Sequence, residues 1–196
     1  MNYRLYEKIV TGLVTDGYIV IEEAIENDLT RALYSSSLNE NRYKKAGISN
    51  SADFHLDSTK RSDKTAWLDE DGGSVSEYLS FCKGLQEYIN RSLYLGLSYY
   101  EAHFALYEKG DFYEKHLDAF KGSKNRVVTT VLYLNPEWQE VDGGSLVVYD
   151  ENNKELTKVV PNAGTLVVFL SDKFPHEVLP SNKKRHSIAG WFRVDR

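Results

Sequence analysis

Extended structure is predicted for the stretch Tyr113-Glu-Lys-His-Leu-Asp118, which leads into a series of short strand patterns. Side chains alternate along a strand, so His116 and Asp118 are expected to point to the same face. A neutral imidazole and a carboxylate placed in this way can bind one metal ion. Polar strand faces often carry such a pair by chance, so the rest of the chain decides its meaning.

Strand patterns of the same kind fill the chain from residue 98 onward. They are separated by turn signals rich in Gly, Pro, Asn and Asp. The predicted strands are Ser98–Tyr107, Tyr113–Asp118, Arg126–Leu134, Ser145–Tyr149, Leu156–Val160, Thr165–Leu170, His176–Leu179 and Ser187–Val194. About eight short strands at regular spacing predict a jelly roll or a barrel.

The first 97 residues are expected to form helices and one long loop. Helices are predicted over Tyr3–Thr15, from Asn27 or Asp28 to about Leu38, and from Val75 to about Leu93, with a first strand at Tyr18–Ile21. A capping box at Ser74–Glu77 would begin the third helix, and Gly96 would end it. The polar stretch from Asn39 to Gly73 lacks a clear period, and a loop of this length is either functional or disordered.

Together these patterns predict a single α+β domain over residues 1–196. Residues 1–97 would supply helical support and a mobile loop, with the N-terminal helices packed on one sheet. Residues 98–196 would form the jelly-roll core.

Composition excludes several classes of protein. The formal charge of -5 argues against nucleic-acid binding driven by bulk electrostatics. Cys82 is the only cysteine, so no internal disulfide and no thiolate metal cluster are expected. The N-terminus lacks the apolar core of a signal peptide, and no apolar run is long enough to cross a membrane. These features favour a reducing cytoplasm and no membrane partner.

A second histidine and an arginine favour metal binding by His116 and Asp118. His176 lies in Phe174-Pro-His-Glu-Val178, and Arg185 follows nine residues after it. Two histidines and a carboxylate are the ligands of a non-haem Fe(II) site that leaves positions open for a co-substrate and O₂. A 2-oxo acid needs a fixed cation for its far carboxylate, and a guanidinium can bind that group through two hydrogen bonds. Alternation in the last strand would place Arg185, Ser187, Ala189 and Trp191 on one ligand-facing side.

The region from Tyr107 to Arg193 resembles the catalytic core of the 2-oxoglutarate- and Fe(II)-dependent prolyl 4-hydroxylases. The resemblance is to the branch that contains the oxygen-sensing animal enzymes and their bacterial relatives. It rests on Tyr113-x-x-His116-x-Asp118, Leu132-Tyr133-Leu134-Asn135 followed by Trp138, Gly143-Gly144-Ser145-Leu146, Phe169-x-Ser171-Asp172, Pro175-His176-Glu177-Val178 and Arg185-x-x-Ile188-x-x-Trp191. A weaker match at Arg61-x-Asp63-Lys64-x-x-Trp67 resembles the mobile segment that closes over substrate in these enzymes.

The resemblance implies that the jelly roll is a double-stranded β-helix. It also implies a role for each matching residue. The iron ligands would be His116, Asp118 and His176. The C5 carboxylate of 2-oxoglutarate would meet Arg185 and the Tyr133 hydroxyl, and Tyr107 and Trp191 would line the co-substrate pocket. Substrate would lie against Asp63, Trp67, Tyr113 and Trp191.

The activity implied by the resemblance is hydroxylation of a prolyl residue in a protein, with O₂ consumed and succinate and CO₂ released. Fe(II), 2-oxoglutarate and O₂ would be required, with ascorbate as a further suggested cofactor. The bacterial relatives suggest a loop of a translation factor, such as elongation factor Tu, as the target. Two alternatives stay open: the same chemistry on a small molecule or a nucleic-acid base, and a non-catalytic cupin-like sensor that binds a metal or ligand. The oligomeric state is also open.

Overall fold

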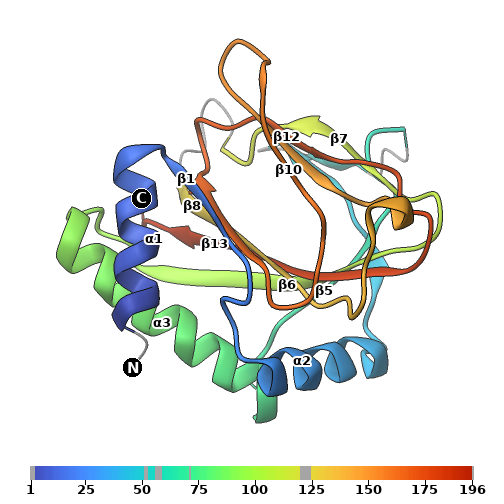
Figure 1. The fold of residues 1–196 in the computed structure, drawn as a ribbon, viewed down its shortest axis with the longest axis horizontal. Coiled ribbons are helices and arrows are strands. Elements are labelled where there is room, and N and C mark those ends of the chain that lie inside the picture. Colours follow the sequence, from blue (N-terminus) through green and yellow to red (C-terminus); the bar gives the residue numbers. More distant parts are fainter. Residues whose placement is uncertain (1–2, 51–52, 56–58, 71, 120–124, 196) are drawn as a thin grey trace.

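Two antiparallel sheets face each other, and three helices cover the outer face of the larger one (Figure 1). The computed structural model describes residues 3–50, 53–55, 59–70, 72–119 and 125–195. In Figure 1 the long strands β6 and β13 run across the middle, with the helices below and to the left and the smaller sheet above. The space between the two sheets holds the candidate site.

The larger sheet has seven strands and the smaller sheet has four. The order in the larger sheet is β1 (Tyr18–Ile21), β11 (Leu166–Leu170), β8 (Arg126–Tyr133), β13 (Arg185–Arg193), β6 (Tyr99–Tyr107), β5 (Lys64–Trp67) and β2 (Lys44–Lys45). The order in the smaller sheet is β10 (Glu155–Val159), β9 (Leu146–Tyr149), β12 (His176–Val178) and β7 (Tyr113–His116). A separate hairpin pairs β3 (Ile48–Asn50) with β4 (Asp53–His55), and a short 3₁₀ helix covers Glu140–Asp142.

All the strands predicted from residue 98 onward are confirmed, with ends that differ by at most two residues. They divide evenly: β6, β8, β11 and β13 belong to the larger sheet, and β7, β9, β10 and β12 to the smaller. Strands that alternate between two facing sheets in this way form the predicted double-stranded β-helix.

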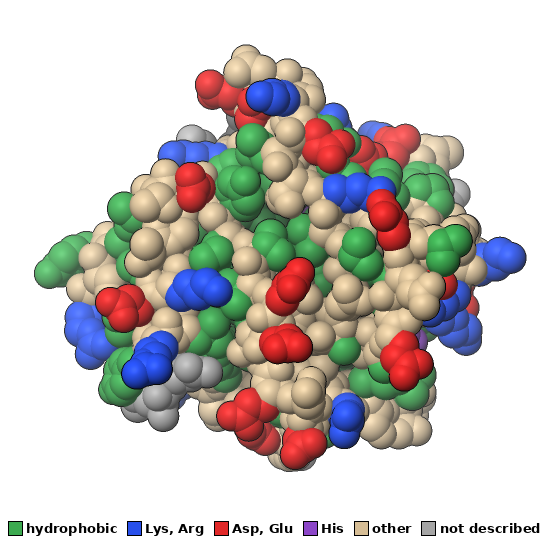
Figure 2. Space-filling model, viewed as in Figure 1, with side chains coloured by type: hydrophobic (Ala, Val, Ile, Leu, Met, Phe, Trp, Pro, Cys, Tyr) green, Lys and Arg blue, Asp and Glu red, His purple; other side chains and the backbone are tan. Residues whose placement is uncertain are grey.

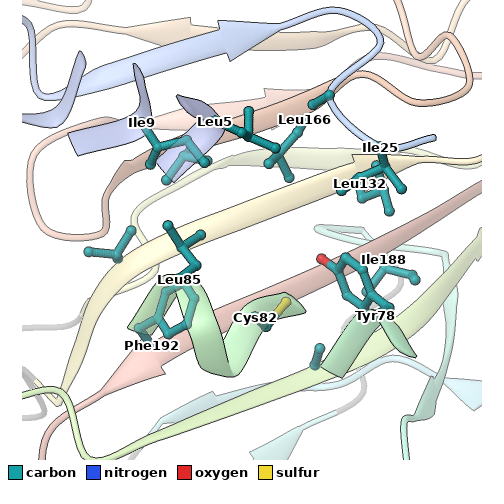
Figure 3. Close-up of a cluster of buried hydrophobic side chains, with 14 of the residues drawn as sticks. Leu5, Ile9, Ile25, Tyr78, Cys82, Leu85, Leu132, Leu166, Ile188 and Phe192 are labelled. Carbon is teal, nitrogen blue, oxygen red and sulfur yellow. The ribbon is translucent and has the colours of Figure 1, made fainter. Parts of the chain in front are cut away.

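Three helices pack their apolar stripes against the larger sheet. They are α1 (Tyr3–Thr15), α2 (Asn27–Asn39) and α3 (Gly73–Leu93). Figure 3 shows Leu5 of α1 beside Leu166 of the sheet, and Leu85 and Tyr78 of α3 beside Phe192 and Ile188. In the part of the chain that the structure describes, no helix combines the length and apolarity needed to cross a membrane.

The predicted caps of α3 are wrong, although the helix ends at Leu93 as predicted. The helix begins at Gly73 without a side-chain cap, because the Ser74 hydroxyl instead bonds the Ser36 hydroxyl of α2 at 3.0 Å. A tertiary contact thus takes the side chain that the capping box would need. At the other end Tyr94 adopts a left-handed conformation (φ 54°) and ends the helix before Gly96.

The stretch from Asn39 to Gly73 is not a plain loop. It contains β2 and β5 of the larger sheet as well as the β3–β4 hairpin. Strand β5 pairs with β6 over four residues, from Lys64 opposite Leu106 to Trp67 opposite His103. Its sequence lacks apolar alternation, so pairing with β6 decides its conformation. The predicted closing segment around Asp63 and Trp67 therefore forms this strand and its approach, and its mobility stays a prediction.

Alternation along β13 separates the core from the site. Arg185, Ser187, Ala189 and Trp191 face the space between the sheets, as predicted. Ile188 and Phe192 face the helices and belong to the core that they form with the larger sheet. His186 also faces the helices, where its Nδ1 lies 3.0 Å from the Ser37 hydroxyl of α2.

Stability is expected to fall as the pH drops from about 6.5 towards 4, and His186 should contribute to that fall. Burial, with Lys184 nearby, lowers the pKa of His186 to about 4, against about 6.5 in an unfolded chain. Between these values the unfolded chain binds the proton more tightly, so acid favours unfolding. Urea unfolding at pH 7 and pH 5 should show a shallower pH dependence in His186→Asn. An unchanged slope would mean that His186 does not titrate in this way.

Candidate active site

A cavity of about 1390 Å³ lies between the two sheets. It is lined by side chains of both sheets and of the segments around residues 42–47 and 61–67. It brings together almost all the predicted site residues: Asp63, Trp67, Tyr107, Tyr113, His116, Asp118, His176, Arg185 and Trp191. Tyr133 does not line it, but lies beneath Arg185, with its ring centroid 5.1 Å from the guanidinium carbon.

The three predicted metal ligands converge. One ligand atom from each of His116, Asp118 and His176 lies within 4.8 Å of the others. His116 stands opposite His176 in the pairing of β7 with β12, and Asp118 follows just after β7 ends. The carboxylate lies between the two imidazoles, with Oδ1 3.8 Å from Nε2 of His116 and Oδ2 3.6 Å from Nε2 of His176.

Backbone carbonyls fix the tautomer of both histidines. Nδ1 of His116 donates to the Glu114 carbonyl at 2.8 Å, and Nδ1 of His176 donates to the Phe174 carbonyl at 3.0 Å. Each ring therefore turns an Nε2 lone pair towards the carboxylate, which is the form that binds a metal. Burial and the neighbouring His176 lower the pKa of His116 to about 3, so its ring is neutral at pH 7.

Two hydroxyls hold the Asp118 carboxylate in place. Thr129 donates to Oδ2 at 2.8 Å, and the Ser171 hydroxyl lies 2.8 Å from the Thr129 oxygen. Because Thr129 donates to the carboxylate, Ser171 must donate to Thr129. Burial alone would raise the pKa of Asp118, but the two histidines hold it below its ordinary value, so the group is an anion. Sequence reasoning missed Thr129, which looked like an ordinary strand residue.

Thr129→Val should lower metal affinity by about tenfold without unfolding the protein. Valine keeps the shape of threonine but removes the donor to Asp118, and partners of this kind typically change metal affinity by about 10- to 100-fold. Thr130→Val is a matched control, since the Thr130 hydroxyl faces the helices and bonds Tyr100 at 2.8 Å. Titration with Mn(II) would measure the metal affinity of both variants. Equal affinities for the two variants would contradict the role given to Thr129.

Arg185 is the largest fully buried side chain, with 1% of its surface exposed. Its Nη1 donates to the Ser187 hydroxyl at 3.1 Å, and its guanidinium carbon lies 4.7 Å from the Tyr107 ring centroid. No Asp or Glu among residues the structure describes forms an ion pair with it, and its Nε has no hydrogen-bond partner there. A buried cation without a counter-ion is costly, so this geometry calls for an anionic ligand.

Tyr133 adds a second unused donor beside Arg185. Its hydroxyl is buried and has no partner among the described residues. Burial raises the pKa of Tyr133 to about 12, so the hydroxyl keeps its proton. A guanidinium and a hydroxyl that converge in this way suit one carboxylate.

The second glycine of the Gly143-Gly144 motif makes room for Arg185. A Cβ at Gly144 would lie 2.9 Å from Cδ of Arg185 and 3.1 Å from the Ser181 hydroxyl. Gly144 also has a φ of 66°, a conformation that other residues rarely adopt. Only glycine therefore lets the arginine side chain pass.

These features fit Fe(II) and 2-oxoglutarate. Two neutral imidazoles and a carboxylate are the ligands of a facial Fe(II) site. The unpaired Arg185 and Tyr133 donors suit the far carboxylate of a dicarboxylic 2-oxo acid.

Asp63 is not free to meet a ligand, because Arg61 binds both of its oxygens at 2.8 and 2.7 Å. Arg61 also lies over the Tyr113 ring, 4.1 Å from its centroid. The other face of that ring stacks on His116, with centroids 3.6 Å apart. The Arg61 side chain is only 12% exposed, so it is not a solvated surface charge. Asp63 thus supports the first metal ligand through Arg61 and Tyr113.

Aromatic rings form the opposite wall of the cavity. His103 lies between Trp67 and Trp191, with centroids 5.2 and 5.4 Å away. Trp67 is 51% exposed and lies at the mouth, whereas Trp191 is buried and carries the Arg126 guanidinium 3.7 Å from its centroid. These positions agree with the pocket roles predicted for the two tryptophans, although contact with a substrate stays a prediction.

Known proteins are similar to this chain in sequence and fold. A family model described as the 2OG-Fe(II) oxygenase superfamily matches residues 102–193. A prolyl-4-hydroxylase of Pseudomonas putida superposes with a TM-score of 0.88 and 38% identity, over 97% of this chain and 100% of that one. This chain belongs to the prolyl 4-hydroxylase branch of the 2OG-Fe(II) oxygenase superfamily. The recognition made from the sequence is confirmed.

Animal members of the superfamily are also similar. A prolyl hydroxylase of Trichoplax adhaerens, solved with a hypoxia inducible factor peptide fragment, has a TM-score of 0.87 and 30% identity, over 98% of this chain and 90% of that one. The hypoxia-inducible factor prolyl hydroxylase of Caenorhabditis elegans is 29% identical over 191 residues, which cover 92% of this chain and 25% of the relative. This chain thus spans a quarter of the nematode protein's length. The cofactors of the superfamily are Fe(II) and 2-oxoglutarate, with O₂ as co-substrate, and the triad described above fits them.

Proposed function

We propose that this protein hydroxylates prolyl residues of a protein substrate, using 2-oxoglutarate and O₂ and releasing succinate and CO₂. The observation that carries the proposal is a buried, unpaired Arg185 in the same cavity as the His116, Asp118 and His176 triad. A jelly roll that only stored or sensed a metal would not need that second, anion-binding site.

Each group of residues has a separate task. The triad would hold Fe(II), with Thr129 and the two backbone carbonyls orienting its donors. Arg185 and Tyr133 would bind and orient 2-oxoglutarate. When bound, iron and 2-oxoglutarate together supply the oxidative chemistry, in which O₂ is split, CO₂ leaves and one oxygen atom enters the substrate C–H bond. The buried walls formed by Trp191 and Val178 would exclude water from the reacting groups.

A protein substrate is favoured over a small molecule. The cavity volume of about 1390 Å³ exceeds the roughly 300–1,000 Å³ typical of small-molecule sites, even though 2-oxoglutarate would take part of it. The Trichoplax relative binds a peptide in its solved structure. A proline in an exposed loop, as in a translation factor, is the kind of target we propose. A single buried cysteine, Cys82, is compatible with action in the cytoplasm.

Two measurements on the same samples test this function. Extracts of the host that lacks the protein are incubated with purified protein, Fe(II) and 2-oxoglutarate. Succinate release is measured, and peptides are searched by mass spectrometry for one added oxygen atom on proline. We expect both signals, and both should vanish when 2-oxoglutarate is omitted. Succinate release without oxidised proline would reject the prolyl substrate, and absence of both would reject the enzymatic function.

A further inference from the structure

We infer that the substrate segment carries carboxylates beside its target proline, and that Lys44 and Lys45 of β2 bind them. This inference rests on the proposed function and names the chemistry of the substrate.

The side chains that line the cavity carry a net positive charge, whereas the rest of the chain carries a net negative charge. The whole protein has a formal charge of -5. Seven Lys and Arg side chains line the cavity against two carboxylates: Arg42, Lys44, Lys45, Arg61, Arg126, Arg185 and Arg193 against Asp63 and Asp118. On the face drawn in Figure 2, by contrast, basic and acidic side chains are interspersed. The positive charge is therefore concentrated where a substrate must enter.

Three of these cations already have an acidic partner or a proposed ligand. Arg61 is bound by Asp63, Arg42 is bound by Glu40 and Asp69, and Arg185 belongs to the 2-oxoglutarate site. Arg61 and Arg42 could bind a further anion only by losing these partners, and Arg185 would be occupied by 2-oxoglutarate.

Lys44 and Lys45 are different. Both are exposed, and neither forms an ion pair within the described ranges. They form β2, the last strand of the larger sheet, and stand opposite Thr65 and Lys64 of β5. The next residue, Ala46, donates its N–H to the Asp63 carbonyl at 2.9 Å, which fixes the pair at the cavity wall. Two unpaired ammonium groups are thus held at the edge of the cavity, on side chains that leave opposite faces of the strand.

A second basic group, on β8 and β13 of the same sheet, lines another part of the cavity. Arg126 and Arg193 share a single oxygen of Glu101, at 3.3 and 2.7 Å, so the trio keeps one excess positive charge. The Nε of Arg193 and the indole Nε1 of Trp191 are buried and have no partner among the residues described. An acidic segment on both sides of the proline would find donors in both places.

The expected preference can be estimated. An exposed ion pair changes affinity by about 1.4- to 5-fold, so two lysines should supply roughly tenfold at low salt. The preference should shrink in about 0.5 M salt, where the screening length is roughly 4 Å. Lysines on an edge strand can also serve only to prevent strand pairing between molecules, in which case no acidic preference would exist.

A displayed peptide library with a central proline and random flanks tests the inference. The protein is loaded with Mn(II) and N-oxalylglycine, an inert analogue of 2-oxoglutarate. Selection is compared for the unchanged protein, for Lys44→Gln with Lys45→Gln, and for the matched control Lys8→Gln with Lys83→Gln. Lys8 and Lys83 are exposed on α1 and α3, outside the cavity. Binding of N-oxalylglycine by each variant verifies that it is folded.

We expect about tenfold enrichment of Asp and Glu over Asn and Gln in the unchanged protein and the control. Enrichment should fall to about twofold in the β2 variant. Selection without acidic bias, no selection at all, or equal bias in all three proteins would overturn the inference. So would displacement of selected peptides by a random single-stranded oligonucleotide at lower concentration than by an acidic peptide. Oxidised proline in the extract assay together with unbiased selection would reject the acidic flank alone and leave the proposed function standing.

Discussion

Arg185→Ala should reduce 2-oxoglutarate affinity by about 150- to 4,000-fold while Mn(II) affinity changes little. The guanidinium is buried, has no acidic partner in the described chain, and faces the same cavity as the triad. A buried charge-assisted pair that loses one partner costs about 3–5 kcal/mol, which corresponds to this change in affinity. Isothermal titration of the Mn(II)-loaded protein would measure the dissociation constant.

Two controls keep this result interpretable. Arg185→Lys should give an intermediate affinity, because lysine keeps the charge but cannot form two parallel hydrogen bonds. Thermal unfolding of each variant shows whether the buried substitution has disturbed the core. Equal loss of metal and 2-oxoglutarate binding in Arg185→Ala would mean that Arg185 is structural.

His176→Ala should lower metal affinity by at least about 100-fold and abolish succinate release. It removes one of three protein ligands, a larger change than loss of the outer partners that usually cost about 10- to 100-fold. His103→Gln is a matched control, because His103 lines the same cavity but does not belong to the triad. A Mn(II) titration monitored by electron paramagnetic resonance would compare the metal affinities of His176→Ala and His103→Gln. A triad variant that binds metal as tightly as the His103 variant would refute the ligand assignment.

Much of the jelly roll and its site could be predicted because both rest on local patterns. Alternation in β13 is enough to place Arg185 and Trp191 on one face. The His116 and Asp118 pair also met as expected, although Asp118 lies just beyond the end of β7 and not within a strand. Here the turn after the strand, rather than strand alternation alone, completes the ligand set.

The features that were missed depend on contacts between distant residues. Strand β5 exists because it pairs with β6, and nothing in Lys64–Trp67 itself signals a strand. Ser74 bonds α2 and leaves α3 without the predicted cap. Thr129 of the larger sheet contacts Asp118 because the smaller sheet packs against the larger one. The burial of Arg61 against Asp63 was missed for the same reason, since a charged residue in a polar stretch gives no sign of burial.

A crystal structure with Mn(II) and 2-oxoglutarate is the most direct test of the central claim. We expect one ion bonded to Nε2 of His116, a carboxylate oxygen of Asp118 and Nε2 of His176. The C5 carboxylate of 2-oxoglutarate should lie against the Arg185 guanidinium and the Tyr133 hydroxyl. An ion bound elsewhere, or a 2-oxoglutarate whose far carboxylate faces away from Arg185, would contradict the account.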